Sequence, residues 1–130
     1  MTADLYPDII SLDYQEDVRP FYAIADALVF PSYREGFPNV VLEAGAMGLP
    51  CIVTDISGCN EIILNNENGI IIPIKDISSL LEAMKKFVLD KRYLQKLKAN
   101  ARSMVIKKFN KHLVWDAILK EYYLLSNSIN

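Results

Sequence analysis

The chain has 130 residues, 52% of them apolar, which is enough for one compact domain with its own core. A formal net charge of −2 argues against a nucleic-acid-binding protein, and no stretch approaches the roughly 18 uninterrupted apolar residues of a membrane span. The amino terminus lacks the basic start and apolar run of a secretory signal, so a cytoplasmic protein is expected.

Four short apolar runs alternate with segments of helix length in the first part of the chain. The runs are Ile9–Leu12, Ala27–Phe30, Cys51–Thr54 and Gly69–Ile72. Because they are nearly continuous in Leu, Ile and Val, they predict strands covered on both faces of a parallel sheet. The intervening segments predict helices near Asp17–Ala25, Asn39–Met47 and Cys59–Leu64. This alternation is typical of an α/β fold.

Only helices are expected after Pro73. The first, Ile77–Leu89, begins behind Asp76, a suitable N-cap residue. A second has apolar residues from Leu94 to Val105 at helical spacing, and a third begins after Asn110. The expected buried side of the third helix is Leu113, Trp115, Ile118, Leu119, Tyr122 and Leu125. A single domain therefore divides into an α/β half, residues 1–76, and a helical tail, residues 77–130.

Charge is distributed unevenly along the chain. Residues 1–76 hold three basic and 12 acidic groups, whereas residues 77–130 hold 11 basic and four acidic groups. Ten of the 14 Lys and Arg residues fall between Lys85 and Lys111. Two interpretations stay open for this basic tail, a solvated helix face and a surface attracted to anionic lipid.

The remaining reactive side chains predict no chemistry of their own. Cys51 and Cys59 lack metal-ligand spacing and are expected to be reduced thiols. His112, the only histidine, lies far along the chain from the paired acids described next and is expected to pack or cap near the last helix.

Two acids, Glu35 and Glu43, stand eight positions apart around a turn-forming tripeptide. Pro38 suits a helix start, so the next three amides are expected to lack intrahelical partners at the carboxyl edge of the sheet. Such amides attract phosphate. Glu43, about 6 Å into the helix, would meet neutral hydroxyls such as a ribose diol, and Glu35 those of a second ring. The residue types alone leave open an ordinary loop acid and helix acid.

The stretch from Glu35 to Ala44, EGFPNVVLEA, resembles the Glu-x7-Glu signature of the retaining GT-B glycosyltransferases of family 4, also described as glycosyl transferases group 1. Many members of this family build bacterial capsules, exopolysaccharides and lipopolysaccharides. The flanking segments match as well, and the resemblance covers essentially the whole chain. These segments are YAIADALVFPS, GLPCIVTDISGCNEII, NGIIIP and KFNKHLVWDAILKEYY.

The resemblance implies a partial Rossmann-like fold, the C-terminal part of a donor-binding domain. About four mostly parallel strands, flanking helices and a helical tail are expected. It also implies a role for each matching residue. Glu35 would act at the reacting centre and Glu43 on the ribose. The sugar would be seated by Gly36, Phe37 and Pro38, the diphosphate by the amides of Asn39, Val40 and Val41, and the base by the loop of Tyr14 and Gln15 with Glu16.

The implied reaction moves a sugar from a nucleotide-diphosphate donor to a sugar or lipid-linked acceptor with retention of configuration. The leaving nucleoside diphosphate would be stabilised electrostatically, with no cofactor and no metal, since neither an Asp-x-Asp motif nor a His cluster argues for one. Competing hypotheses are a non-catalytic nucleotide-binding or interaction module and a nucleotide-sugar epimerase of related architecture, which matches the Gly-Phe-Pro stretch less well.

Three departures from the family pattern carry expectations. Asp13 stands where the family usually has Gly, which affects the base-side loop. Arg19 and Arg34 do not match the basic pair that neutralises the diphosphate, so the isolated chain is expected to be inactive. Strands that would separate Ile9–Leu12 from Ala27–Phe30 are missing, so the first strand should pair directly with the second or with another copy of the chain, forming a homodimer.

Overall fold

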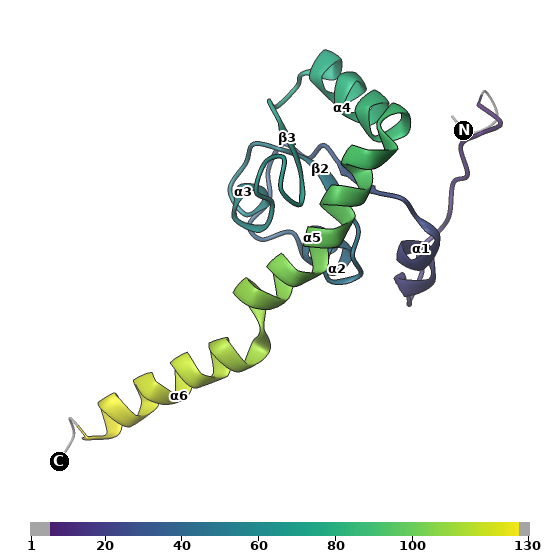
Figure 1. Ribbon diagram of the computed structural model, residues 1–130. Coiled ribbons are helices and arrows are strands. Elements are labelled where there is room, and N and C mark those ends of the chain that lie inside the picture. Colours follow the sequence, from purple (N-terminus) through teal and green to yellow (C-terminus); the bar gives the residue numbers. More distant parts are fainter. Residues whose placement is uncertain (1–5, 128–130) are drawn as a thin grey trace.

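The computed structural model describes residues 6–127, whose strands form one parallel sheet (Figure 1). The strands are β1 (Leu28–Phe30), β2 (Cys51–Thr54) and β3 (Gly69–Ile72), in the spatial order β1-β2-β3. Leu28 pairs with Cys51, and Cys51 pairs with Gly69. The predicted α/β class and the parallel sheet are confirmed, with three strands rather than about four.

Helices connect the strands and continue after β3. They are α1 (Arg19–Ile24), α2 (Asn39–Ala46), α3 (Cys59–Ile62), α4 (Ile77–Leu89), α5 (Lys91–Phe109) and α6 (Lys111–Asn127). Asp76 caps α4 as predicted, since its carboxylate accepts a hydrogen bond from the Ser79 amide at 2.9 Å. Asp90 caps α5 in the same way through the Tyr93 amide, also at 2.9 Å. These two carboxylate caps thus fix where the long helices begin.

Both faces of the sheet are covered. Successive side chains of β2 point to opposite faces, and each face packs against its own buried cluster. Cys51 and Val53 belong to one buried cluster, which includes residues of α2 and α3 together with Val105 of α5. Ile52 belongs to the other, formed with β3, α4 and the first half of α5. The continuous apolar run from Cys51 to Thr54 correctly predicted burial on both faces.

The predicted first strand, Ile9–Leu12, is wrong. The segment is irregular and its side chains are exposed, Ile10 by 82%. Direct pairing with Ala27–Phe30 is therefore also wrong, since within residues 6–127 β1 pairs with β2 alone. A strand needs a neighbouring ladder for its backbone groups, and an apolar run cannot reveal whether a neighbour lies within reach. Pairing with a second copy stays a prediction.

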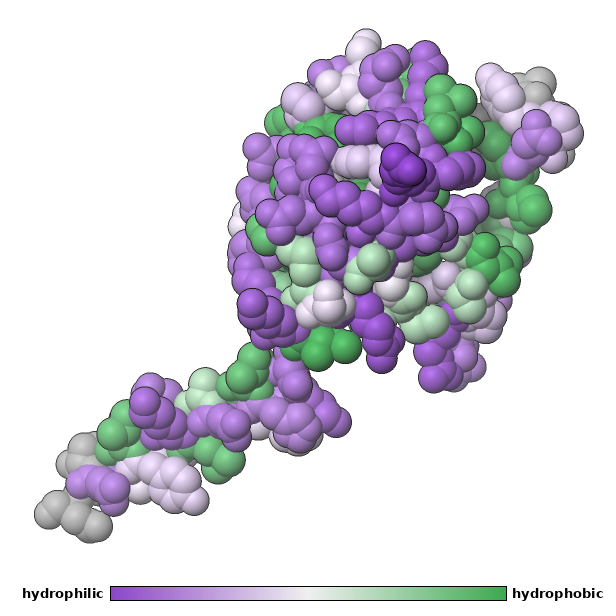
Figure 2. All heavy atoms as spheres, in the orientation of Figure 1, coloured by the Kyte–Doolittle hydropathy of each residue, from purple (hydrophilic) through white to green (hydrophobic). Residues whose placement is uncertain are grey.

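The predicted burial of the last helix is also wrong within the described residues. Helix α6 forms where expected, yet it projects from the body as an arm and buries none of its residues (Figure 1). Trp115 is 54% exposed, and Figure 2 shows apolar surface along this arm. Helical periodicity identifies an apolar face but not the surface that would cover it. None of the helices in residues 6–127 is both long and apolar enough to cross a membrane.

Gly45 of α2 allows α5 to cross α2 closely. A β-carbon at Gly45 would lie 2.7 Å from Cγ2 of the buried Val105. We expect Gly45→Ala to destabilise the chain by about 1 kcal/mol, because overpacking costs roughly 1–3 kcal/mol while the gain in helix propensity offsets about 1 kcal/mol. Urea unfolding followed by circular dichroism measures the change.

The same substitution in a Val105→Ala background is the matched control. The obstructing methyl groups are then gone, so Gly45→Ala should stabilise α2 by about 0.5–1 kcal/mol through helix propensity alone. An identical effect in both backgrounds would contradict the contact.

Candidate functional site

The loop from Pro31 to Pro38 leaves the carboxyl end of β1 and opens helix α2. Pro38 is buried and serves as the N-cap, so the helix begins at Asn39. The proline therefore precedes the first helical residue and is not itself that residue. In the part of the chain that the structure describes, the Asn39 and Val40 amides have no acceptor. The Val41 amide donates to the Pro38 carbonyl at 3.1 Å in a tight first turn. The expectation that all three amides lack intrahelical partners is therefore wrong for Val41.

Glu35 lies on this loop with its carboxylate half-buried. Its Oε1 accepts a hydrogen bond from the Ser32 hydroxyl at 2.7 Å. The Ser32 carbonyl in turn accepts one from the hydroxyl of Thr54 at the end of β2. The two contacts tie Glu35 to the central strand, so its position follows from the sheet and not from the loop alone.

Two buried thiols lie beneath this part of the site. Burial raises the pKa of Cys59 to about 11, with a further contribution from the negative charge of Glu35. Burial likewise raises the pKa of Cys51 to about 12. Both cysteines are free, as predicted, and both remain protonated at neutral pH. They pack rather than react.

Gly58, in the loop after β2, packs closely against the Gly36–Pro38 turn. Sequence reasoning missed this role. Its φ of +83° lies in the left-handed region. A β-carbon there would come within 2.5 Å of the Gly36 carbonyl oxygen and 2.8 Å of Pro38 Cδ. Only glycine permits both the conformation and the close approach. The sequence signal was the glycine of DISGCNE directly after a buried strand.

Glu43 lies on the exposed side of α2, facing α1. The hydroxyl of Tyr22 is 3.4 Å from Glu43 Oε2 and 3.5 Å from the Val40 carbonyl oxygen, so its single proton is shared between two long hydrogen bonds. Burial raises the pKa of Tyr22, and the charge of Glu43 raises it further. Sequence reasoning also missed Tyr22, although its place in YAIADALVFPS puts it on the helix before β1.

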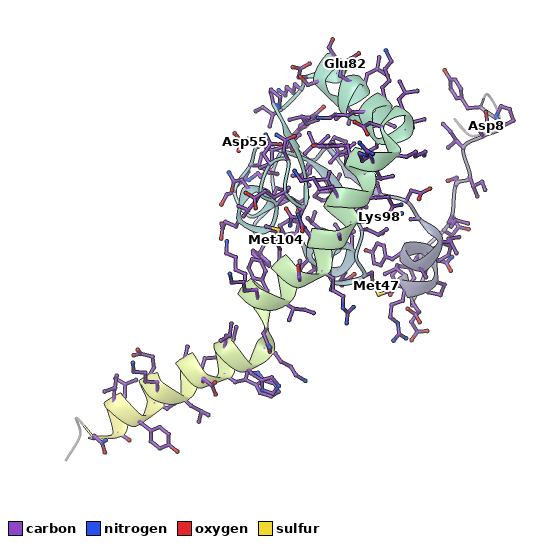
Figure 3. The ribbon with its side chains drawn as sticks, viewed as in Figure 1. Asp8, Met47, Asp55, Glu82, Lys98 and Met104 are labelled. Atoms are coloured by element: carbon purple, nitrogen blue, oxygen red, sulfur yellow. The ribbon has the colours of Figure 1, made fainter. Side chains whose placement is uncertain are left out.

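A hollow of about 670 Å³ lies between α1 and α2 beside Glu43. Figure 3 places Met47, one of its lining residues, next to α1. Its other lining residues are Glu16, Asp17, Val18, Arg19, Tyr22, Glu43 and Ala46. Glu35 does not line it. The hollow therefore belongs to the Glu43 end of the site.

The expected base-binding residues are not brought into this hollow. Tyr14 is 91% exposed, and the Gln15 amide donates back to the Asp13 carbonyl at 3.1 Å. Of that loop only Glu16 reaches the lining. The irregular course of the chain before α1 explains the difference, because the loop does not follow a strand of the sheet.

The positive charge near the hollow is already engaged. Arg19 forms a two-pronged ion pair with Asp17, at 2.8 and 2.7 Å, which lowers the pKa of Asp17 to about 2. The hollow is thus acidic overall and suits a neutral ligand rich in hydroxyl groups. An anion is better placed at the two unpartnered amides of α2, between Glu35 and Glu43.

A model of one protein family, described as Glycosyl transferases group 1, matches residues 4–104. A capsular polysaccharide biosynthesis glycosyltransferase from Staphylococcus aureus is 30% identical over 116 residues, covering 89% of this chain and 30% of the relative. A UDP-Gal:α-D-GlcNAc-diphosphoundecaprenol α-1,3-galactosyltransferase from Escherichia coli is 34% identical over 102 residues, covering 78% of this chain and 26% of the relative. The chain therefore spans less than a third of either relative's length.

A solved structure shares nearly the entire arrangement. Sucrose-phosphate synthase from Thermosynechococcus elongatus superposes with a TM-score of 0.87 at 26% identity, over 98% of this chain and 33% of that one. The superposition supports a GT-B fold for the α/β body and its helical tail.

Gly58→Ala should displace the Gly36–Pro38 turn. Gly48→Ala is the matched control, because Gly48 also has a positive φ, +82°, but a β-carbon there would meet nothing within 4 Å. Both variants incur the left-handed penalty, roughly 1–2 kcal/mol, and Gly58→Ala suffers the clash in addition. The measurement is urea unfolding together with NMR amide shifts at Gly36 and Phe37. Equal destabilisation with unmoved Gly36 and Phe37 signals would contradict the close approach.

Proposed function

Because the chain belongs to the family described as Glycosyl transferases group 1, we propose that it forms the donor-binding part of a retaining glycosyltransferase that uses a nucleotide sugar. The observation that carries this proposal is the start of α2, where the unpartnered amides of Asn39 and Val40 lie between the acids Glu35 and Glu43. Each part matches one chemical portion of such a donor.

The diphosphate would bind the two free amides and the positive end of the α2 dipole. The Glu43 carboxylate, beside the hollow between α1 and α2, would accept hydrogen bonds from the ribose diol. On the opposite side, Glu35 would meet the donor sugar over the turn of Gly36, Phe37 and Pro38. Electrostatic stabilisation of the leaving diphosphate would supply the rate enhancement at this end of the donor, without a metal.

Relatives indicate the wider process. The Staphylococcus aureus relative is named for capsular polysaccharide biosynthesis, and the Escherichia coli relative for transfer from UDP-Gal. We extend this to a bacterial surface-polysaccharide transferase, with UDP-galactose as a reasonable first donor to test. We also expect the purified 130-residue chain not to catalyse transfer, since Arg19, the cation that lines the hollow, is paired with Asp17. Sugar transfer by this chain would contradict that expectation.

The two acids should act on different parts of the donor. Glu43→Gln should weaken UDP and UDP-galactose alike, because both contain ribose, whereas Glu35→Gln should weaken only UDP-galactose. A loss of about tenfold, equivalent to about 1.4 kcal/mol, is expected for each affected ligand, near the lower end for hydrogen bonds to a charged group. Isothermal titration calorimetry or saturation-transfer NMR with the 130-residue chain measures both affinities.

Glu121→Gln, on the projecting helix α6, is the matched control and should change neither affinity. If neither Glu35→Gln nor Glu43→Gln alters binding, the donor-site assignment fails and a non-catalytic module becomes the better description.

The basic tail suggests where the intact protein works. Exposed cations of α4 and α5 include Lys91 and Lys107, whereas Lys85, Lys98 and Lys108 already contact protein acceptors. We propose peripheral attraction to anionic lipid, close to a lipid-linked acceptor of the kind named for the Escherichia coli relative. Co-sedimentation with phosphatidylglycerol vesicles should exceed that with phosphatidylcholine and fall as salt rises. Binding that depends on neither lipid charge nor salt would contradict this proposal and favour the alternative, a solvated helix face.

A further inference from the structure

The last residue of α5, Phe109, touches the turn that we assign to the donor sugar. Its ring lies edge-on to the ring of Phe37, with centroids 5.5 Å apart and planes inclined by 62°. This is a favourable geometry for two aromatic rings. Pro38, the N-cap that follows Phe37 directly, is buried and is approached closely by the Gly58 backbone instead.

Phe109 is itself held in a fixed place. Its side chain packs against the buried cluster that contains Val41 and Cys59. The end of α5 is further tied to its neighbours by two side chains. Arg102 donates to the Ala46 carbonyl at the end of α2, and Lys108 donates to the Glu61 carbonyl in α3, each at 2.6 Å. These contacts hold the Phe109 ring in a defined position against Phe37.

The turn is supported on two sides and open on a third. The Gly58 backbone approaches Gly36 and Pro38 closely on one side, and the Phe109 ring meets Phe37 on another. At Gly36 a β-carbon would find nothing within 4 Å, and Phe37 remains 42% exposed. A ligand placed against this open side would rest on backbone whose position is set partly by Phe109.

We propose that Phe109 is a positioning residue for the sugar end of the donor, acting through Phe37. It would not touch the ligand. This inference rests on the donor-site assignment above, and it predicts selectivity within the ligand. Losing the Phe109 ring should disturb binding of the sugar and leave the ribose and its Glu43 contact unaffected, since Glu43 faces α1 on the other side of α2.

The test uses the full 130-residue chain with Phe109→Leu, which keeps an apolar side chain but removes the ring. Affinity for UDP-galactose should fall about 2- to 10-fold, in line with the strength of an aromatic pair, while affinity for UDP should change less than about twofold. Phe109→Tyr should restore the UDP-galactose affinity. Ile106→Ala, an exposed position one turn earlier on the same helix, is the control and should change neither.

NMR amide shifts and hydrogen exchange at Gly36 and Phe37 give a readout that needs no ligand. Phe109→Leu should move these signals and speed their exchange, whereas Ile106→Ala should not. Unchanged signals at Gly36 and Phe37, or equal losses for UDP and UDP-galactose, would overturn the inference. If the wild-type chain binds neither ligand, the donor-site assignment is what fails, and the amide signals still decide whether Phe109 positions the turn.

Discussion

Strand β2 is buried along its whole length, and its side chains alternate between two apolar clusters on opposite faces of the sheet. That double burial requires helices on both sides, and β1 and β3 pair with β2 in parallel, as is usual for a sheet covered on both faces. Parallel neighbours end at the same edge, so the loops after β1 and β2 meet there. The contact of Gly58 with the Gly36–Pro38 turn is a direct result. The candidate site is therefore built by the sheet.

The chemistry of the site depends on how few positive charges it contains. Glu35 is tied to the sheet through Ser32 and Thr54, Glu43 stands beside an acidic hollow, and Arg19 is already paired with Asp17. Two carboxylates favour hydroxyl groups, whereas the amides at the start of α2 favour an anion. A ligand that is negative in the middle and rich in hydroxyls at both ends satisfies all three. A nucleotide sugar has this order of groups.

Helix α5 links this site to the rest of the chain. It crosses α2 closely at Gly45, binds the ends of α2 and α3 through Arg102 and Lys108, and places Phe109 against Phe37. Helix α5 thus does more than cover the sheet, because its last turn supports the turn before α2. Family membership and the GT-B likeness agree with a body arranged in this way.

Local patterns in the sequence determined the α/β class, the burial of Cys51–Thr54, the Asp76 cap and the placing of Glu35 and Glu43 on either side of a helix start. These features depend on periodicity and capping chemistry, which neighbouring residues carry. Only the tertiary structure decided that Ile9–Leu12 is no strand, that α6 projects uncovered, and that Gly58, Tyr22 and Phe109 support the site. Each of these depends on whether a residue distant in sequence packs against the segment. The local pattern of apolar and aromatic residues does not contain that information.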